Sequence, residues 1–158
     1  YVPQSIYLLD DTIRRNIALG LEDHEVDEDA LAAAIRLAQL GRFIDRQPEG
    51  LDTIVGESGV RISGGERQRI GIARALYHDP AILILDEATS ALDNTTERAV
   101  IEAVEGMRGQ RTVVMIAHRL STVQGCEVLY YMKDGRIEAR GDYETLRRGH
   151  REFREMAA

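Results

Sequence analysis

The chain has 158 residues, enough for about one domain, and its 44% hydrophobic and 30% charged residues exclude wholesale disorder. Lys and Arg total 20 against 27 Asp and Glu, a formal net charge of -7. This disfavours nucleic-acid binding and binding to an anionic membrane surface, because either needs a basic face. The single cysteine, Cys126, favours a reducing compartment. The longest aliphatic run covers only residues 81–85, far short of the roughly 20 that span a bilayer.

The first half of the chain is predicted to be mostly helical. A helix is predicted over 27–41, where Asp27 can cap the N-terminus, apolar residues recur with helical spacing, and Gly41 ends the helix. Residues 47–65 are rich in glycine and are predicted to be loop. A second amphipathic helix is predicted over 66–77.

The second half alternates strands with helices. Residues 81–85 are apolar without alternation, as expected for a strand that is buried on both faces of a parallel sheet. Asn94 and Glu97 look like the capping pair of a helix that runs to about Met107. The remaining predicted elements are a buried strand at 112–117, strands at 128–132 and 136–139 joined by a tight turn at Asp134-Gly135, and a helix from Asp142. The fold class is therefore α/β.

A turn of small residues comes before the helix predicted over 66–77. In the run Ser63-Gly64-Gly65-Glu66 two glycines allow close approach of backbone N–H groups to an anion, and the helix dipole favours negative charge there. The Ser63 hydroxyl adds another donor. By itself, the run is also typical of an ordinary turn and helix start.

Two carboxylates follow the apolar strand at 81–85. Asp86 and Glu87 are placed at the carboxyl edge of a parallel sheet, where ligands bind in such folds. One carboxylate can hold Mg²⁺ while its neighbour points to the other side and acts as a base. The alternative is an acidic strand end that caps the next turn. His118 ends the next apolar strand, and a structural role is the alternative for it as well.

Taken together, these segments resemble the nucleotide-binding domain of an ABC transporter. The residues that carry the resemblance, in the family's order and at its separations, are Gln4, Ser63 to Glu66, Ile82 to Glu87, Ser90 to Asp93, and His118. Residues 53–59 resemble a loop that is specific to exporter-type members. The resemblance covers nearly the whole chain. Ile62 and Glu66 stand where the family most often has Leu and Gln, and both replacements are conservative.

The resemblance implies a fold and a role for each matching residue. The fold is a partial P-loop NTPase (RecA-like) ABC ATPase core, with a helical signature subdomain at about 5–78 and the C-terminal half of the core at about 79–158. Asp86 would bind Mg²⁺ and Glu87 would activate the attacking water. Gln4 would lie in the loop that senses Mg²⁺ and the γ-phosphate of ATP, and His118 would contact that phosphate.

A second set of residues would act across a dimer interface. The signature residues would grip ATP held by a second copy of the domain, and the following loop would cross to that copy. The two groups implied are Ser63, Gly64, Gly65 and Glu66 for the signature, and Ser90, Ala91, Leu92 and Asp93 for the loop. The implied partners are a second nucleotide-binding domain and a transmembrane domain, which would hold the chain at the cytoplasmic face of the cell membrane.

The sequence contains no phosphate-binding motif G-x-x-x-x-G-K-[ST], because Lys133 is its only lysine and Asp134 follows it. We therefore expect the chain to be a piece of an ABC exporter. The whole exporter is expected to be an ATPase, and the isolated piece is expected to be inactive. Two alternatives are a soluble ABC ATPase outside transport and a non-catalytic half-domain that binds a full cassette. The transported substrate would be selected by membrane helices.

Overall fold

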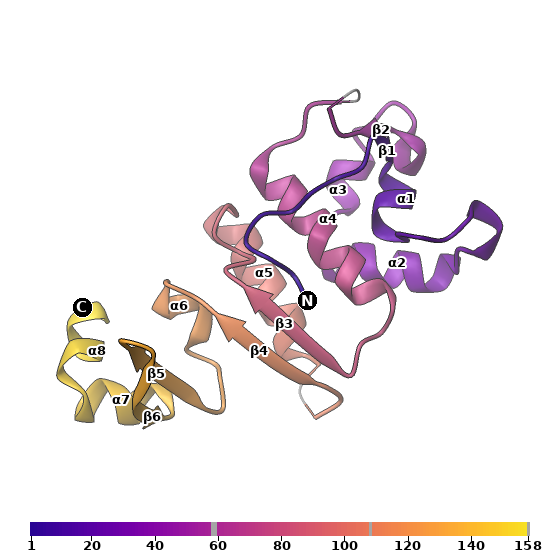
Figure 1. Cartoon of the computed structure of the whole chain (residues 1–158). Coiled ribbons are helices and arrows are strands. Elements are labelled where there is room, and N and C mark those ends of the chain that lie inside the picture. The colour runs from indigo at the N-terminus through magenta and orange to yellow at the C-terminus, as the bar shows by residue number, and fades with distance from the viewer. Residues whose placement is uncertain (58–59, 108, 158) are drawn as a thin grey trace. The chain divides into compact units, whose positions relative to one another are not determined.

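The computed structural model describes residues 1–57, 60–107 and 109–157, and its contacts divide the chain into two units, residues 1–116 and 117–158. The first unit contains, in order, β1 (Asp11–Thr12), α1 (Ile13–Ile17), the 3₁₀ helix η1 (Asp23–Glu25), α2 (Glu28–Leu37), α3 (Gly41–Ile44), the 3₁₀ helix η2 (Gly50–Asp52), β2 (Ile54–Val55), α4 (Gly64–Tyr77), β3 (Ile82–Asp86), α5 (Asn94–Glu105) and β4 (Thr112–Ile116) (Figure 1). The second contains α6 (Leu120–Val123), β5 (Leu129–Lys133), β6 (Arg136–Gly141), α7 (Tyr143–Gly149) and α8 (Arg151–Met156).

Parallel pairing brings three segments of the first unit to one sheet edge. Strands β3 and β4 are parallel and in register from Ile82 with Thr112 to Asp86 with Ile116. The N-terminal segment runs along the other side of β3 (Figure 1), where the Val2 N–H donates to the Ile84 carbonyl at 2.8 Å and the Asp86 N–H donates to the Val2 carbonyl at 2.9 Å. The residues that follow Val2 and β3 therefore meet at the carboxyl edge, as predicted for an α/β fold.

One hydrophobic core runs from the helices of the first unit to its sheet. Helix α4 packs against α1 and α2, and its Ile70, Ile72 and Ala73 are fully buried together with Leu83 of β3. Val100 and Val104 of α5 join the same core. The contacts divide the chain after Ile116, and the subdomain boundary near residue 78 stays a prediction.

The helix predicted over 27–41 is shorter than expected. Asp27 caps it as predicted, since its side chain accepts hydrogen bonds from two N–H groups of the first turn, but α2 ends at Leu37. Gln39 ends the helix by adopting a left-handed backbone with φ 57°. The prediction that Gly41 ends this helix is wrong, because Gly41 begins the short helix α3.

The cap of α5 lies one residue earlier than predicted. Asp93 is the capping residue, and its side chain accepts hydrogen bonds from the N–H groups of Thr95 and Thr96. The predicted capping pair of Asn94 and Glu97 is therefore wrong. Glu97 instead turns inward, where its carboxylate accepts a hydrogen bond from the Thr89 hydroxyl at 3.1 Å, with both side chains buried.

Strand β4 is buried on one face only. Val113 and Met115 pack against the core of the first unit, whereas Val114 is 45% and Ile116 50% exposed. The prediction of a buried strand at 112–117 is thus wrong for one face. The prediction that the strand at 81–85 is buried on both faces is also wrong, because Ile82 of β3 is 59% exposed. Within the described residues, β4 pairs with β3 along one edge and with no strand along the other.

The second unit is built on the predicted hairpin. Strands β5 and β6 are antiparallel, and the turn residues Asp134 and Gly135 have φ values of 49° and 73°, the left-handed pair that a tight turn of this type requires. The helix predicted from Asp142 is two helices, because α7 ends at Gly149 and the His150 side chain caps α8. None of the helices in the described part of the chain is long and apolar enough to cross a bilayer.

Candidate functional site

The carboxyl edge of the first unit brings three of the predicted site residues together. The Gln4 side-chain amide donates a hydrogen bond from Nε2 to Oε2 of Glu87 at 2.8 Å. The neighbouring Asp86 has a different partner, because its Oδ2 accepts a hydrogen bond from the Tyr1 hydroxyl at 2.8 Å. This hydrogen bond raises the pKa of Tyr1 above its ordinary value. The two adjacent carboxylates are therefore held by two different side chains.

The backbone after β3 makes a sharp bend. Glu87 has a left-handed backbone with φ 49°, and its N–H donates to the Ile116 carbonyl at 2.9 Å. The Glu87 carbonyl in turn accepts from the Ser90 N–H at 3.0 Å. The bend takes Glu87 out of the strand direction and leads into the predicted interface loop, Ser90 to Asp93.

The donor set at this edge fits Mg²⁺. Asp86 supplies a carboxylate, and Gln4 supplies an amide oxygen from a neighbouring segment. Oxygen donors of these kinds are what Mg²⁺ prefers in proteins. The described residues contain no cluster of three or more His, Cys, Asp or Glu side chains that could hold a metal. An ion here would therefore bind through few protein ligands together with phosphate oxygens, as is usual for Mg²⁺ at nucleotide sites.

The predicted anion turn forms the beginning of α4. Ser63 caps the helix, since its hydroxyl accepts from the Glu66 N–H at 3.2 Å. The Glu66 carboxylate accepts from the Ser63 N–H at 2.8 Å, which completes a reciprocal capping box. The helix is 14 residues long, and its positive N-terminal end favours negative charge at Gly64 and Gly65. The Ser63 hydroxyl already donates to the Glu66 carboxylate there, at 2.8 Å.

This turn is in close contact with the predicted interface loop. A Cβ at Gly65 would lie 3.1 Å from the Ala91 carbonyl oxygen, and one at Gly64 would lie 3.5 Å from the Ala91 Cβ. Leu92 is buried beside them. A side chain at position 65 would therefore push the Ala91 backbone away by a few tenths of an ångström, and the two motifs are in direct contact.

Asp93 has a local role in the structure. It caps α5 and also accepts a hydrogen bond from the Thr96 hydroxyl at 2.7 Å. That hydrogen bond and those from backbone N–H groups hold the pKa of Asp93 below its ordinary value. Its predicted contact with a second copy stays a prediction.

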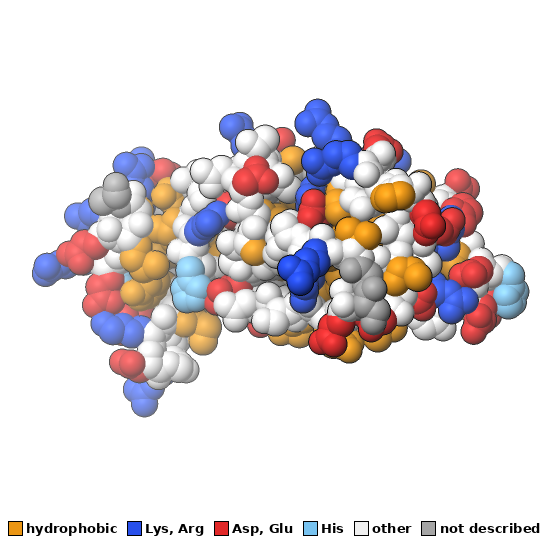
Figure 2. Space-filling view, turned by 90° about the horizontal axis from the view of Figure 1, so that it is seen from above, with side chains coloured by type: hydrophobic (Ala, Val, Ile, Leu, Met, Phe, Trp, Pro, Cys, Tyr) orange, Lys and Arg blue, Asp and Glu red, His pale blue; other side chains and the backbone are white. Residues whose placement is uncertain are grey.

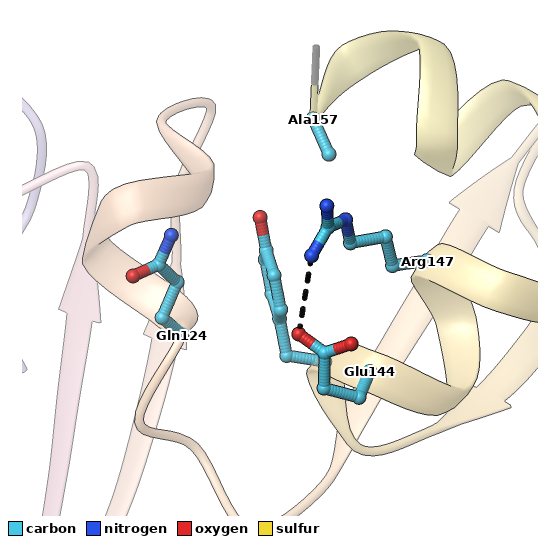
Figure 3. Close-up of a pocket in the computed structure, with 5 residues that line it drawn as sticks. Gln124, Glu144, Arg147 and Ala157 are labelled. Atoms are coloured by element: carbon cyan, nitrogen blue, oxygen red, sulfur yellow. Dashed lines mark hydrogen bonds and ion pairs between the residues drawn. The ribbon is translucent and has the colours of Figure 1, made fainter.

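Two further predictions lie outside the edge just described. His118 belongs to the second unit, so its approach to a phosphate stays a prediction. The loop predicted at 53–59 begins with the buried Thr53 and with β2, while residues 58 and 59 lie outside the described residues. A shallow hollow in the second unit is lined by Gln124, Tyr143, Glu144, Arg147 and Ala157 (Figure 3) and contains none of the predicted site residues.

Sequence reasoning missed two side chains that hold this edge. Tyr1 binds Asp86, as described above. Gln68 of α4 is only 4% exposed and contacts the bend after β3. Gln68 lies two positions before Ile70 and therefore off the face predicted to point inward, so the helical pattern gave no signal for it, and no sequence pattern distinguishes Tyr1.

The chain is similar to known proteins over nearly its whole length. The model of the family described as "ABC transporter" matches residues 1–90. The chain is 48% identical over 145 residues to ABC transporter B family member 6 of Dictyostelium discoideum, a match that covers 92% of this chain and 21% of that protein. It is 46% identical over 145 residues to the ATP-dependent lipid A-core flippase of Haemophilus influenzae, covering 92% of this chain and 24% of the flippase.

A solved structure has the same fold. A bacterial Atm1-family ABC exporter with ATP bound superimposes with a TM-score of 0.91 at 40% sequence identity, covering 99% of this chain and 27% of that one. The chain thus has the α/β fold of an ABC ATPase domain, of the P-loop NTPase class. The chain belongs to the ABC transporter family, and the solved structure that it matches is that of an exporter. It spans about a quarter or less of the length of these relatives.

Proposed function

We propose that this chain is the catalytic and signature-bearing part of the nucleotide-binding domain of an ABC exporter, in which hydrolysis of MgATP drives transport across a membrane. The observation that carries the proposal is the carboxyl edge at which Gln4 binds Glu87 at 2.8 Å beside Asp86. The family membership supports the same reaction. The implied partners are a transmembrane domain and a second copy of the ATPase domain at the cytoplasmic face of the membrane.

Glu87 is the proposed general base. In the proposed reaction its carboxylate takes the proton from a water molecule as that water attacks the γ-phosphorus. The Gln4 amide orients the carboxylate through the hydrogen bond to Oε2. His118 would contact the γ-phosphate. Bound Mg²⁺, held by Asp86 and Gln4, would neutralise part of the charge on the phosphates.

The beginning of α4 would act on a different ATP molecule. Ser63 to Glu66 present a hydroxyl and the positive end of a helix, which suits the γ-phosphate of ATP bound by a second copy. The loop from Ser90 to Asp93 lies against the same turn and would meet that copy. Figure 2 shows acidic and basic side chains interspersed over the surfaces that it draws. The formal net charge of -7 disfavours a nucleic-acid partner.

The proposal is tested by replacing the base in the whole transporter that contains this chain. Glu87→Gln keeps the shape of the side chain but cannot accept a proton, so ATP turnover should fall by about 10² to 10⁴ while ATP still binds. The matched control is Glu102→Gln, which removes only a surface ion pair with Arg98. Wild-type turnover of the Glu87 variant would contradict the assignment, and His118 would become the candidate base.

The 158-residue chain alone should not hydrolyse ATP. Its only lysine, Lys133, is followed by Asp134, so the sequence offers no P-loop to cradle the β- and γ-phosphates. The measurement is phosphate release by the purified chain in the presence of MgATP. Turnover near one per second, within the range of phosphoryl-transfer enzymes, would contradict this expectation.

A further inference from the structure

Gln68 is a buried polar side chain with a full set of partners. It lies on α4, five residues after Ser63, and is 4% exposed. Its Oε1 accepts a hydrogen bond from the Ala91 N–H at 2.9 Å. Its Nε2 donates to the Ser90 hydroxyl at 3.2 Å and to the Glu87 carbonyl at 3.4 Å. One amide thus binds three residues of the bend that follows β3.

This bend has an unfavourable backbone that must be held from outside. Glu87 adopts φ 49°, a conformation that is uncommon for residues other than glycine and persists only where the surroundings fix it. Since an amide group left unpaired in a buried position is unfavourable, Gln68 and the bend stabilise each other. The backbone that carries the Glu87 carboxylate is therefore held by a residue of α4.

The same helix is fixed against the same bend at its first turn. A Cβ at Gly65 would lie 3.1 Å from the Ala91 carbonyl oxygen, so α4 and the loop approach each other closely there. The contact at Gly65 limits how closely α4 and the loop can approach. The hydrogen bonds of Gln68 fix which residues of the loop lie opposite the helix.

We infer that Gln68 is a positioning residue that couples the signature turn at Ser63 to the backbone of Glu87. The inference rests on the proposed function, in which the signature turn acts on the ATP of a second copy and Glu87 acts on the ATP of its own copy. Gln68 then places the groups for both nucleotides in one rigid arrangement. It contacts the backbone behind the site, so it affects the alignment for hydrolysis more than the binding of ATP.

The test is made in the whole transporter with Gln68→Met, which keeps the side-chain length and removes the donors and the acceptor. Misplacement of reacting groups by about 1 Å can cost up to about 10² in rate. We expect kcat per bound nucleotide to fall by about 10- to 100-fold, with KM for ATP nearly unchanged. Gln68→Glu keeps the acceptor for the Ala91 N–H but turns a carboxylate oxygen toward the Glu87 carbonyl in a buried position, so its kcat should fall at least as far.

The matched control is Ile72→Val. Ile72 is fully buried on the same helix, and its side chain cannot form a hydrogen bond to the bend. This variant reports what loss of stability alone does to kcat. If Gln68→Met and Ile72→Val have the same kcat per bound nucleotide, the role of Gln68 is structural only and the inference is overturned. If Gln68→Met does not accumulate as folded protein, Gln68→Glu decides by the same comparison.

Glu87→Gln in the same preparation separates the two proposals. If Glu87→Gln abolishes turnover and both Gln68 variants match the control, the proposed function stands and the inference fails. If Glu87→Gln retains wild-type turnover, the assignment of Glu87 as the base in the proposed function is wrong, whatever the Gln68 variants show.

Discussion

The two units of the chain differ in how they are stabilised. The first unit, residues 1–116, has a hydrophobic core that extends from α1 to α5 and contains fully buried side chains such as Ile13 and Leu83. In the second unit, residues 117–158, the buried hydrophobic side chains are Val123, Leu146 and Phe153. Its hairpin leaves Met132 62% exposed.

The second unit is stabilised more by contacts between aromatic rings and by polar contacts than the first unit is. Phe153 packs edge-on against Tyr131 and Tyr143, with ring centroids 6.3 Å and 5.6 Å apart. Glu152 binds the Lys133 ammonium at 2.6 Å and the Tyr131 hydroxyl at 3.0 Å. Asp86, Glu87 and the signature turn at Ser63 therefore lie in the same unit, the one with the larger hydrophobic core. This core supports the positions of these side chains relative to one another.

The largest expected effect comes from shortening one side chain in each unit. Leu83→Ala removes a fully buried side chain of β3 and should lower the free energy of unfolding of the first unit by about 2–5 kcal/mol. Met132→Ala acts on an exposed side chain and should change stability by no more than about 0.5 kcal/mol. The measurement is urea unfolding of the chain, followed by circular dichroism.

Equal effects of these two substitutions would break the comparison. A large loss for Met132→Ala would mean that the hairpin face is covered in solution, for example by self-association, which light scattering of the same samples would reveal.

A smaller effect is expected from pH in the second unit. The hydrogen bond from Lys133, and then that from Tyr131, hold the pKa of Glu152 below its ordinary value. Because the folded-state pKa is lowered, these bonds stabilise the unit above the unfolded-state pKa of about 4.3. This stabilisation is lost as the pH falls through the folded-state pKa. The carboxylate is exposed, so solvent screening keeps the effect small.

The pH effect is measured by amide exchange of β5 and β6 in the wild type and in Glu152→Gln. The wild type should be better protected at about pH 7, and the difference should vanish toward about pH 3. A difference in protection that grows as the pH falls would contradict the lowered pKa of Glu152. In a Lys133→Met background the pH dependence should shrink.

Local chemistry made several elements predictable. Asp and Gly both adopt the left-handed backbone that the turn at Asp134-Gly135 requires. The hairpin could therefore be predicted from these two residues. Asp27 caps α2 as predicted, because the preference of Asp for this position is local. The carboxyl edge was also predictable, since parallel pairing follows from the apolar strand at 81–85.

Other features depend on tertiary contacts. Asp93 and Asn94 are equally good caps, and the choice between them is made by Glu97, which turns inward to the buried Thr89. Gln39 has no intrinsic preference for the left-handed backbone that ends α2. The hydrogen bonds of Gln68 join residues about 20 positions apart in the sequence. A local sequence pattern therefore could not predict them.

The most direct test of the central claim, that Glu87 is the base for ATP hydrolysis, is a single-turnover measurement on the whole transporter. The transporter is mixed with a limiting amount of labelled ATP and quenched at intervals, so that cleavage is followed apart from product release. The account predicts that Glu87→Gln binds the nucleotide but leaves it uncleaved over many wild-type turnover times. Cleavage at the wild-type rate in this variant would contradict it.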